Sequence, residues 1–443
     1  MNALRRIWRN LRTSFWFLPL LIVAFSMVLA VTLIAADSTM GDRWLGRWPR
    51  LLGADAVGAR AILSTIAGSM ITVVGITFSM TLVTLALASS QYSSRILRNF
   101  IRDRVTQTVL GVFGGIFTYC LIVLRTIRVH EEFGFVASVA VSFSIVLAIG
   151  GIGVLIFFIH HIASSIQASS IIAAVADETM AAVDRIFPSA LGQASAEDGP
   201  DPVPAQVAQL DWQPVPCVRN GYVQSVDGDA LMRLARQHKT IVRMEHGIGA
   251  FMVQGTPLVR VALDAAPDEA LVAALQAAYS ISRHRTLDQD CAFGIRQIVD
   301  MAMRALSPGV NDTTTAVMCI DYLTAILSRL ALRNIPSPHR LEDGALRVIT
   351  VGQTFESLVS ESFDQIRNNA AGNVAVMLRL LGAIHTIASL TSQPLRRQVL
   401  REQITWMTEL AERTVPAPHD RARFEHRRTQ VLQGFEAAPA LPR

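Results

Sequence analysis

The densest group of polar side chains in this chain of 443 residues lies between Arg283 and Asp312. Its carboxylates and its histidine could exchange protons, and its arginines could bind an anion. A buried structural network would need the same residue types, so the pattern leaves both interpretations open. The group consists of Arg283, His284, Asp288, Asp290, Arg296, Asp300, Arg304, Asn311 and Asp312.

Known catalytic signatures are absent from the sequence. It contains no HExxH zinc motif, no Walker-type phosphate loop, no GxSxG elbow and no kinase signature. The 4 cysteines form no CxxC pair, so neither a zinc site nor a disulfide framework is expected. We therefore predict no metal and no cofactor, and an enzyme would have to rely on an unfamiliar constellation.

Local signals place the polar group on two helices and the turn between them. Arg296, Asp300 and Arg304 repeat every fourth residue beside an apolar stripe, which is typical of a salt-bridge row along a helix. Ser307-Pro-Gly then ends this helix. Asn311 or Asp312 can cap the helix that follows.

A second set of polar residues lies inside an apolar segment, 61–90. Its small and hydroxylated side chains share one side of a helix, and Ile71, Phe78 and Leu82 share another. A further strip, Thr77, Thr81 and Thr84, is polar again. The small face either packs against other helices, with hydroxyls bonded to their own backbone, or lines a pore. This face consists of Thr65, Gly68, Ser69, Thr72, Gly75, Ser79, Ala86 and Ser90.

The composition requires that part of the chain lies in lipid. Hydrophobic residues make up 51% of the chain and charged residues 17%, with a mean hydropathy of +0.37. Four apolar segments, 14–36, 61–90, 105–124 and 134–159, are long enough to cross a hydrocarbon core of about 30 Å. The net charge of +5 comes from arginines interspersed with acids, which argues against a nucleic-acid partner.

Four spans place both termini on one side of the membrane. Arginines crowd the N-terminal arm and the connection after the second span, so the positive-inside rule places both termini in the cytoplasm. Residues 91–102 suit an amphipathic stretch at the headgroups or a plain charged loop. His160 and His161 end the last span and are expected to anchor it at the interface. No span has a charged residue in its interior, which favours a passive pore over a proton-coupled transporter.

The part after the spans begins with a linker and short strands. Residues 189–216 have the composition of a flexible linker. Alternating patterns at 222–227 and 250–253 indicate strands around a helical insert at 229–238. Segment 221–259 resembles the barrel-sandwich hammerhead of lipoyl-like domains. It lacks the Met-Lys-Met hairpin that carries a prosthetic group, so a structural or ligand-sensing role is expected.

We predict a mainly α fold, with a transmembrane bundle followed by a cytoplasmic α+β region. Helical spacing continues to Ile281 and again from Ala316 to about Leu432. The predicted parts are a four-span domain at 1–165, a connecting helix and linker at 166–216, a small β-rich module at 217–264, a helical domain at 265–433 and a tail at 434–443.

Several phrases resemble the uncharacterised bacterial membrane-protein family DUF2254, over essentially the whole chain. The most specific are Phe293-Gly-Ile-Arg-Gln-Ile-Val-Asp and Arg304-Ala-Leu-Ser-Pro-Gly-Val-Asn-Asp, supported by the run from Ser79 to Ser93 and by Gly221-Tyr-Val-Gln. The family's usual phrase has Pro after Asn-Asp, where this chain has Thr313, so the turn is expected to be looser. The resemblance implies membrane topology, here in a bacterial inner membrane, and no established activity.

Together these patterns predict a homo-oligomeric pore or channel-like protein that is gated by its cytoplasmic domain. Its partners would be the lipid bilayer, further copies of itself and a small ion or an anionic ligand. One alternative is a membrane-anchored sensor or scaffold without conductance. An enzyme with an unrecognised cytoplasmic site is the weaker alternative.

Overall fold

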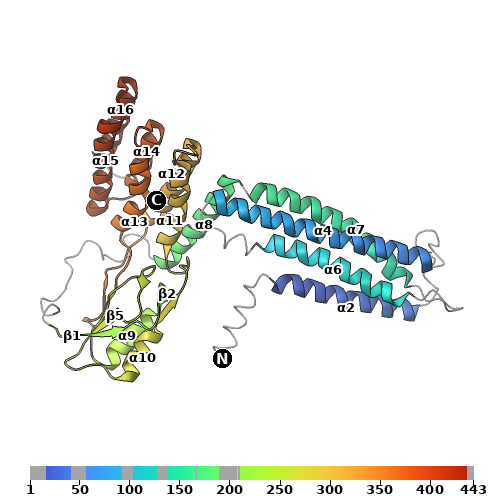
Figure 1. Cartoon of the computed structure of the whole chain (residues 1–443). Helices are drawn as coiled ribbons and strands as arrows, with labels where there is room; N and C mark the ends of the chain where they lie inside the picture. Colours follow the sequence, from blue (N-terminus) through green and yellow to red (C-terminus); the bar gives the residue numbers. More distant parts are fainter. Residues whose placement is uncertain are drawn as a thin grey trace. The chain divides into compact units, whose positions relative to one another are not determined.

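The computed structural model describes residues 16–40, 56–91, 103–127, 137–165, 167–188, 207 and 210–436. The chain divides into two compact units, residues 1–170 and 171–443, called the N-terminal and the C-terminal unit below. The described residues are mainly helical, as predicted, and their strands lie in the C-terminal unit (Figure 1). The basic N-terminal arm and most of the predicted amphipathic stretch at 91–102 lie outside the described residues.

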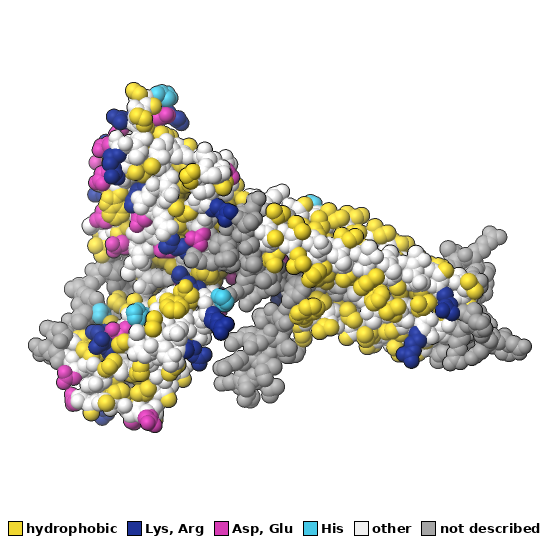
Figure 2. All heavy atoms as spheres, in the orientation of Figure 1, with side chains coloured by type: hydrophobic (Ala, Val, Ile, Leu, Met, Phe, Trp, Pro, Cys, Tyr) yellow, Lys and Arg dark blue, Asp and Glu magenta, His cyan; other side chains and the backbone are white. Residues whose placement is uncertain are grey.

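Four long apolar helices form the described part of the N-terminal unit and correspond to the predicted spans. α2 covers Phe17–Met40, α4 covers Ala56–Gln91, α6 covers Arg104–Thr126 and α7 covers Ser138–Ser165. Figure 2 shows hydrophobic side chains over much of the visible surface of these helices. α4 has 36 residues, so at roughly 1.5 Å per residue it exceeds the length that a bilayer core requires.

Within the described residues, 5 helices are long and apolar enough to cross a membrane, one more than predicted. The fifth is α12, Thr313–Ala331, in the C-terminal unit. Its Ile320 and Leu327 are fully buried there, and its Asp321 and Arg329 form ion pairs. Burial against protein and paired charges suit a core helix of that unit, so four spans remain our prediction.

α6 is the core of the N-terminal unit because it packs against the other three helices. Its Phe113 and Tyr119 are at most 1% exposed. The Tyr119 hydroxyl donates to the carbonyl of Ala140 on α7 at 2.8 Å, and its ring meets the ring of Phe143 edge to face. A tyrosine buried in apolar surroundings needs such an acceptor, so this bond fixes α7 against α6.

Glycines on α6 and α7 permit close helix approach. A Cβ at Gly111 would overlap Ile22 of α2, and a Cβ at Gly115 would overlap the Ser26 hydroxyl. A Cβ at Gly151 of α7 would lie 3.3 Å from the Ile116 side chain of α6, which is a tight contact without overlap. Small residues let the backbones of two helices approach closely. The van der Waals contacts made there favour helix association in lipid.

Polar contacts tie the bundle together at both ends. The Asp37 carboxylate at the end of α2 accepts bonds from the backbone N–H groups of Val139 and Ala140 at 3.2 and 3.1 Å. It thus satisfies free amides of the first turn of α7. At the opposite end Asp103 caps α6 and lies 3.0 Å from Nε2 of His161 on α7. His161 therefore binds a carboxylate, in addition to the interfacial position predicted for it.

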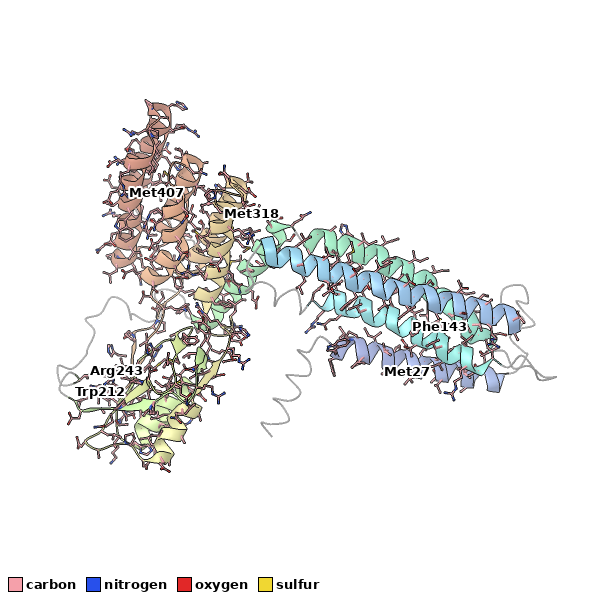
Figure 3. The ribbon with its side chains drawn as sticks, in the orientation of Figure 1. Met27, Phe143, Trp212, Arg243, Met318 and Met407 are labelled. Carbon is pink, nitrogen blue, oxygen red and sulfur yellow. The ribbon has the colours of Figure 1, made fainter. Side chains whose placement is uncertain are left out.

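The C-terminal unit combines two sheets with helices. α8 covers Ala168–Ile186 and leads from the membrane helices into this unit. The strands order as β1-β5-β3-β8-β7 in one sheet and β4-β2-β6 in the other. The guanidinium of Arg243 on β3 lies over the ring of Trp212 on β1 at 4.7 Å (Figure 3). The elements are β1 Trp212–Pro216, β2 Gly221–Val226, α9 Gly228–Gln237, β3 Val242–Met244, β4 Phe251–Met252, β5 Pro257–Ala262, α10 Glu269–Ala277, β6 Tyr279–Ser282, β7 His339–Glu342 and β8 Ala345–Ile349.

The strands depart from the predicted pattern at several places. β1 lies inside the predicted linker 189–216. β6 begins at Tyr279, where helical spacing had predicted a helix as far as Ile281. β7 and β8 lie inside the segment predicted to be wholly helical, and β8 joins the larger sheet parallel to β3.

Each departure has a physical reason. Asp343 and Gly344 between β7 and β8 have φ of 51° and 76°, the positive values of a two-residue hairpin turn that Asp-Gly favours. The Asp-Gly dipeptide is a hairpin signal that is visible in the sequence itself. β6 pairs with β2 over its full length, so tertiary pairing outweighs the helical spacing before it. The pairing of β3 with β8 joins segments far apart in the chain and has no local signal.

Helices complete the C-terminal unit, and a buried arginine holds two of them together. Arg396 is 2% exposed and donates to the carbonyls of Ala331 and Arg333 at 3.0 Å each, at the end of α12. It therefore satisfies helix-terminal carbonyls that would otherwise lack donors. The remaining helices are α11 Cys291–Ala305, α13 Phe355–Asn369, α14 Val374–Ala388, α15 Pro394–Thr414 and α16 Pro418–Glu436.

Replacing Arg396 by glutamine should destabilise the C-terminal unit by about 2–3 kcal/mol, because buried carbonyls lose charged donors. The melting temperature of the solubilised full-length protein reports this loss. R413Q is the matched control, since Arg413 is exposed on the same helix. Equal melting temperatures for R396Q and R413Q would contradict the capping role of Arg396.

Candidate functional site

The small face of α4 points away from the other helices of its own chain. Thr65, Gly68, Ser69, Thr72, Gly75, Ser79 and Ala86 are all exposed, and a Cβ at Gly68 or Gly75 would meet no atom within 4 Å. The side chain of Ser90 lies outside the described residues. These residues therefore lie on one side of α4, and the described helices of the N-terminal unit leave that side uncovered.

The helix buries a different polar strip. Thr77 and Thr84 are 1% and 4% exposed and continue the line of Leu63 and Met70, which pack in the core of the unit. Ile71 and Phe78 of the predicted lipid stripe are each 48% exposed. α4 thus has one face toward its own bundle, one apolar face, and one face of small and hydroxylated residues that is open.

Hydroxyls on both polar strips donate to carbonyls of their own helix. Ser69 bonds to Ile66 and Thr72 bonds to Gly68, each at 2.9 Å, and Thr77, Thr81 and Thr84 do the same. These bonds satisfy the hydroxyl protons within a single helix. The oxygen lone pairs remain available to a neighbouring helix, to water or to a cation.

The cluster predicted between 283 and 312 centres on the carboxylate of Asp290, which is 1% exposed. Arg285 donates to its two oxygens at 2.7 and 2.9 Å. The Gln353 amide donates at 3.0 Å, and the backbone N–H of Phe293 donates at 3.2 Å, which caps α11. A buried carboxylate is stable only with such partners, and here they occupy most of its acceptor capacity.

Cys291 completes this network as a hydrogen-bond donor. Its thiol donates to Oε1 of Gln353 at 2.8 Å. Burial raises the pKa of the Cys291 thiol to about 12, and the neighbouring Asp290 adds to the effect. A thiol that stays protonated at neutral pH is a poor nucleophile. The centre of the cluster is therefore built as a static network and offers no activated group.

Most other predicted site residues hold the surrounding backbone or face solvent. The carbonyl of His284 accepts a bond from Gln224 at 2.7 Å, and the carbonyl of Asp288 accepts one from Arg185 at 2.9 Å. Arg296 forms an ion pair with Glu361. The side chains of Arg283, His284, Asp288, Arg304 and Asn311 are exposed, and that of Asp300 is half-buried.

Asn311 and Asp312 have different roles in the turn before α12. Asn311 has φ of 48° and provides the left-handed conformation of the turn. Asp312 caps α12 by accepting from the N–H of Thr315 at 3.0 Å. The Thr313 hydroxyl accepts from Asn373, the cap of α14, at 2.9 Å. Threonine in place of the family's proline thus gains a link to α14.

α8 is anchored inside the C-terminal unit by side chains that sequence reasoning did not single out. Asp184 pairs with Arg329 of α12 and with Arg333 beyond its end, at 2.5 and 2.6 Å. A Cβ at Gly294 of α11 would overlap the Thr179 hydroxyl of α8. α8 is therefore packed directly on α11 and paired with α12.

Sequence reasoning missed partners that lie far away in the chain. Gln353 bonds to Asp290 and Arg185 bonds to the loop before it, while Asp184 pairs with α12, and all three come from segments that carry no motif. Among the later helices, Glu361 of α13 joins the cluster through Arg296, whereas Arg379 of α14 pairs with Asp321. In the part of the chain that the structure describes, no three His, Cys, Asp or Glu side chains gather in a way that could hold a metal ion.

The apolar helices and the comparisons agree on a membrane protein. Residues 12–386 match the family described as predicted membrane protein (DUF2254), and the chain belongs to this family. An uncharacterized protein of Mycobacterium bovis is 34% identical over 371 residues, which cover 82% of this chain and 70% of that protein. An uncharacterized protein of Mycobacterium tuberculosis is also 34% identical over 371 residues. No solved structure matches the chain.

Replacing Asp290 by alanine should destabilise the C-terminal unit by roughly 3 kcal/mol, because Arg285 would be left partly buried without its carboxylate. Hydrogen exchange of the full-length protein should show faster exchange at 285–293. D288A is the matched control on the same loop, because the Asp288 side chain is exposed. Unchanged exchange in D290A would show that the carboxylate does not hold this loop.

Replacing Asp184 by asparagine should weaken the anchoring of α8 by roughly 1 kcal/mol, seen as faster hydrogen exchange in α8. Hydrogen bonds from Arg329 lower the pKa of Asp184 below its usual value of 3.8. The pair therefore stabilises at all pH values above 3.8 and is lost only as the pH falls through the lower folded value. The stabilisation that Asp184 gives to α8 should therefore be present and unchanged between pH 5 and 8. D177N, on an exposed site of α8, is the control.

Proposed function

We propose that this protein is an integral protein of the bacterial inner membrane that forms a homo-oligomeric pore or channel-like assembly. In this proposal the chain crosses the membrane four times, both termini lie in the cytoplasm, and the C-terminal unit gates the pore. The observation that carries the proposal is the open face of α4, where small and hydroxylated residues are exposed on an isolated chain.

Association of several copies through this face is supported by the chemistry of lipid. Hydrocarbon offers no partner for hydroxyl lone pairs, and helices in lipid associate where small residues allow backbones to come close. Gly68 and Gly75 are open and lie two turns apart on this face. A second copy would cover both the glycines and the hydroxyls, which the described helices of one chain leave exposed.

A pore wall is supported by what the face contains and by what it lacks. Ser69, Thr72 and Ser79 would present neutral oxygens to water or a small ion. The described helices of the N-terminal unit carry no charged side chain midway along them that could act as a proton relay. Neutral oxygens bind ions weakly, which suits permeation better than tight binding.

Gating by the C-terminal unit is supported by α8. α7 ends at Ser165 and α8 begins at Ala168. The far end of α8 is held by Asp184 and by Arg185, which donates to the carbonyls of Leu287 and Asp288. A change in the 283–290 loop would therefore act on the helix that continues from the last span.

A membrane scaffold or sensor without conductance is the second candidate. It is favoured by the hydroxyls of Ser69 and Thr72, which already donate to their own backbone and so act as compact packing groups. An enzyme has less support, because the donors around Asp290 occupy most of its acceptor capacity and the Cys291 thiol stays protonated.

Cysteine substitution in reconstituted liposomes tests the pore. We expect ion flux through T72C to fall several-fold after treatment with a cationic thiol reagent, because Thr72 lies on the open face. F78C is the matched control, since Phe78 is similarly accessible but lies on the apolar stripe. The native cysteines are all buried and should react slowly.

The outcomes separate the two candidates. Intact oligomers that cross-link through T72C but show no flux under tension, voltage or added anions would remove the pore and leave the scaffold. A monomer in both detergent and bilayers would remove both candidates, because each needs the open face of α4 to be covered by another copy.

A further inference from the structure

Three loops meet at one end of the sheet β4-β2-β6. β2 starts there at Gly221, whereas the antiparallel strands β4 and β6 end there, since Tyr222 pairs with both Phe251 and Ser282. We call this end the tip surface. It consists of the segment before β2, the residues at the end of β4 and the residues just after β6, represented by Val218, Arg219, Phe251, Val253, Arg283 and His284.

The tip surface exposes apolar side chains that a soluble domain would usually cover. Val218, Phe251 and Val253 are 49%, 55% and 51% exposed. The Phe251 ring leans on Tyr222 edge to face at 5.0 Å, which holds it in an exposed position. Exposed apolar side chains gathered at loop ends indicate an interaction site.

The exposed charged side chains next to these apolar residues are basic. Segments 217–222, 250–257 and 280–286 contain no Asp or Glu. Arg219, Arg283 and His284 are exposed there, while Arg285 is turned inward and neutralised by Asp290. In Figure 2, hydrophobic side chains lie beside Arg and His side chains over the β-rich part of the unit. The nearest acid along the third loop with an exposed side chain is Asp288.

Hydrogen bonds hold the loops in a fixed shape. The N–H of Cys217 donates to Thr256 at 2.8 Å, and the N–H of Gly255 donates back to Cys217 at 2.9 Å. The N–H of Gln254 donates to the Asn220 side chain at 2.7 Å. A preorganised surface loses little conformational entropy when it binds.

We propose that the tip surface docks on the anionic headgroups of the bilayer that holds the same chain. Arginines pair with lipid phosphates, and the apolar side chains enter the headgroup boundary, as in other peripheral membrane contacts. The surface lacks the acids that a matching basic and acidic interface between two copies would need. α8 begins at Ala168, just after α7 ends at Ser165, so the C-terminal unit cannot leave the membrane vicinity. The inference does not depend on conductance.

Nitroxide labels on the full-length protein in nanodiscs test the proposal. A label at V253C should lose accessibility to a water-soluble nickel complex several-fold when phosphatidylglycerol replaces part of the phosphatidylcholine. The double variant R219E/R283E should restore most of the accessibility. V218C provides a second label position should V253C fold poorly.

L341C is the matched control, because Leu341 is also 51% exposed but lies on β7 of the other sheet. Its accessibility should not respond to the lipid. Equal accessibility of V253C in both lipids would overturn the proposal. Protection of V253C in detergent without lipid would also overturn it and would assign the tip surface to a contact between copies.

Discussion

The buried carboxylate of Asp290 is the interaction on which the C-terminal unit depends. Arg285, Gln353 and the first turn of α11 all donate to it. A buried charge costs several kcal/mol unless it is paired, so these segments must meet at one point. Gly249 passes beside them with φ of 86°, where a Cβ would overlap both Asp290 and Arg285. One carboxylate thus joins the β-rich part to the helical part.

Neighbouring residues on the loop before Asp290 have different roles. Arg283, His284 and Arg285 are adjacent in the sequence, yet Arg285 pairs with a buried acid whereas Arg283 and His284 are exposed. Because the loop is fixed on its inner side, its outer residues are held in place at no further entropic cost. The same constraint therefore builds the core and presents the basic part of the tip surface.

The sequence predicted what local patterns determine. The length of the apolar segments identified α2, α4, α6 and α7. The candidate caps Asn311 and Asp312 marked the start of α12, and the structure assigns the cap to Asp312. Gln353 could not be predicted as a partner of Asp290, because it comes from a segment far along the chain that only tertiary folding brings there. Arg285 lies on the same loop as Asp290, but no local pattern distinguishes it from Arg283, which is exposed. Asp343 and Gly344 form the turn of the β7–β8 hairpin, inside a segment for which helical spacing had predicted helix throughout.

The polar side chains on the faces of α4 restrict how the protein can be arranged in a membrane. Thr77 and Thr84 are buried in the chain's own bundle, so their hydroxyls are removed from lipid. Thr72 and Ser79 are not, and hydrocarbon cannot replace the partners that their oxygens would have in water. A single chain in lipid therefore leaves polar groups in contact with hydrocarbon. Contact with a second copy or with water removes that cost. Cover by a second copy alone corresponds to a scaffold, whereas cover by water corresponds to a pore.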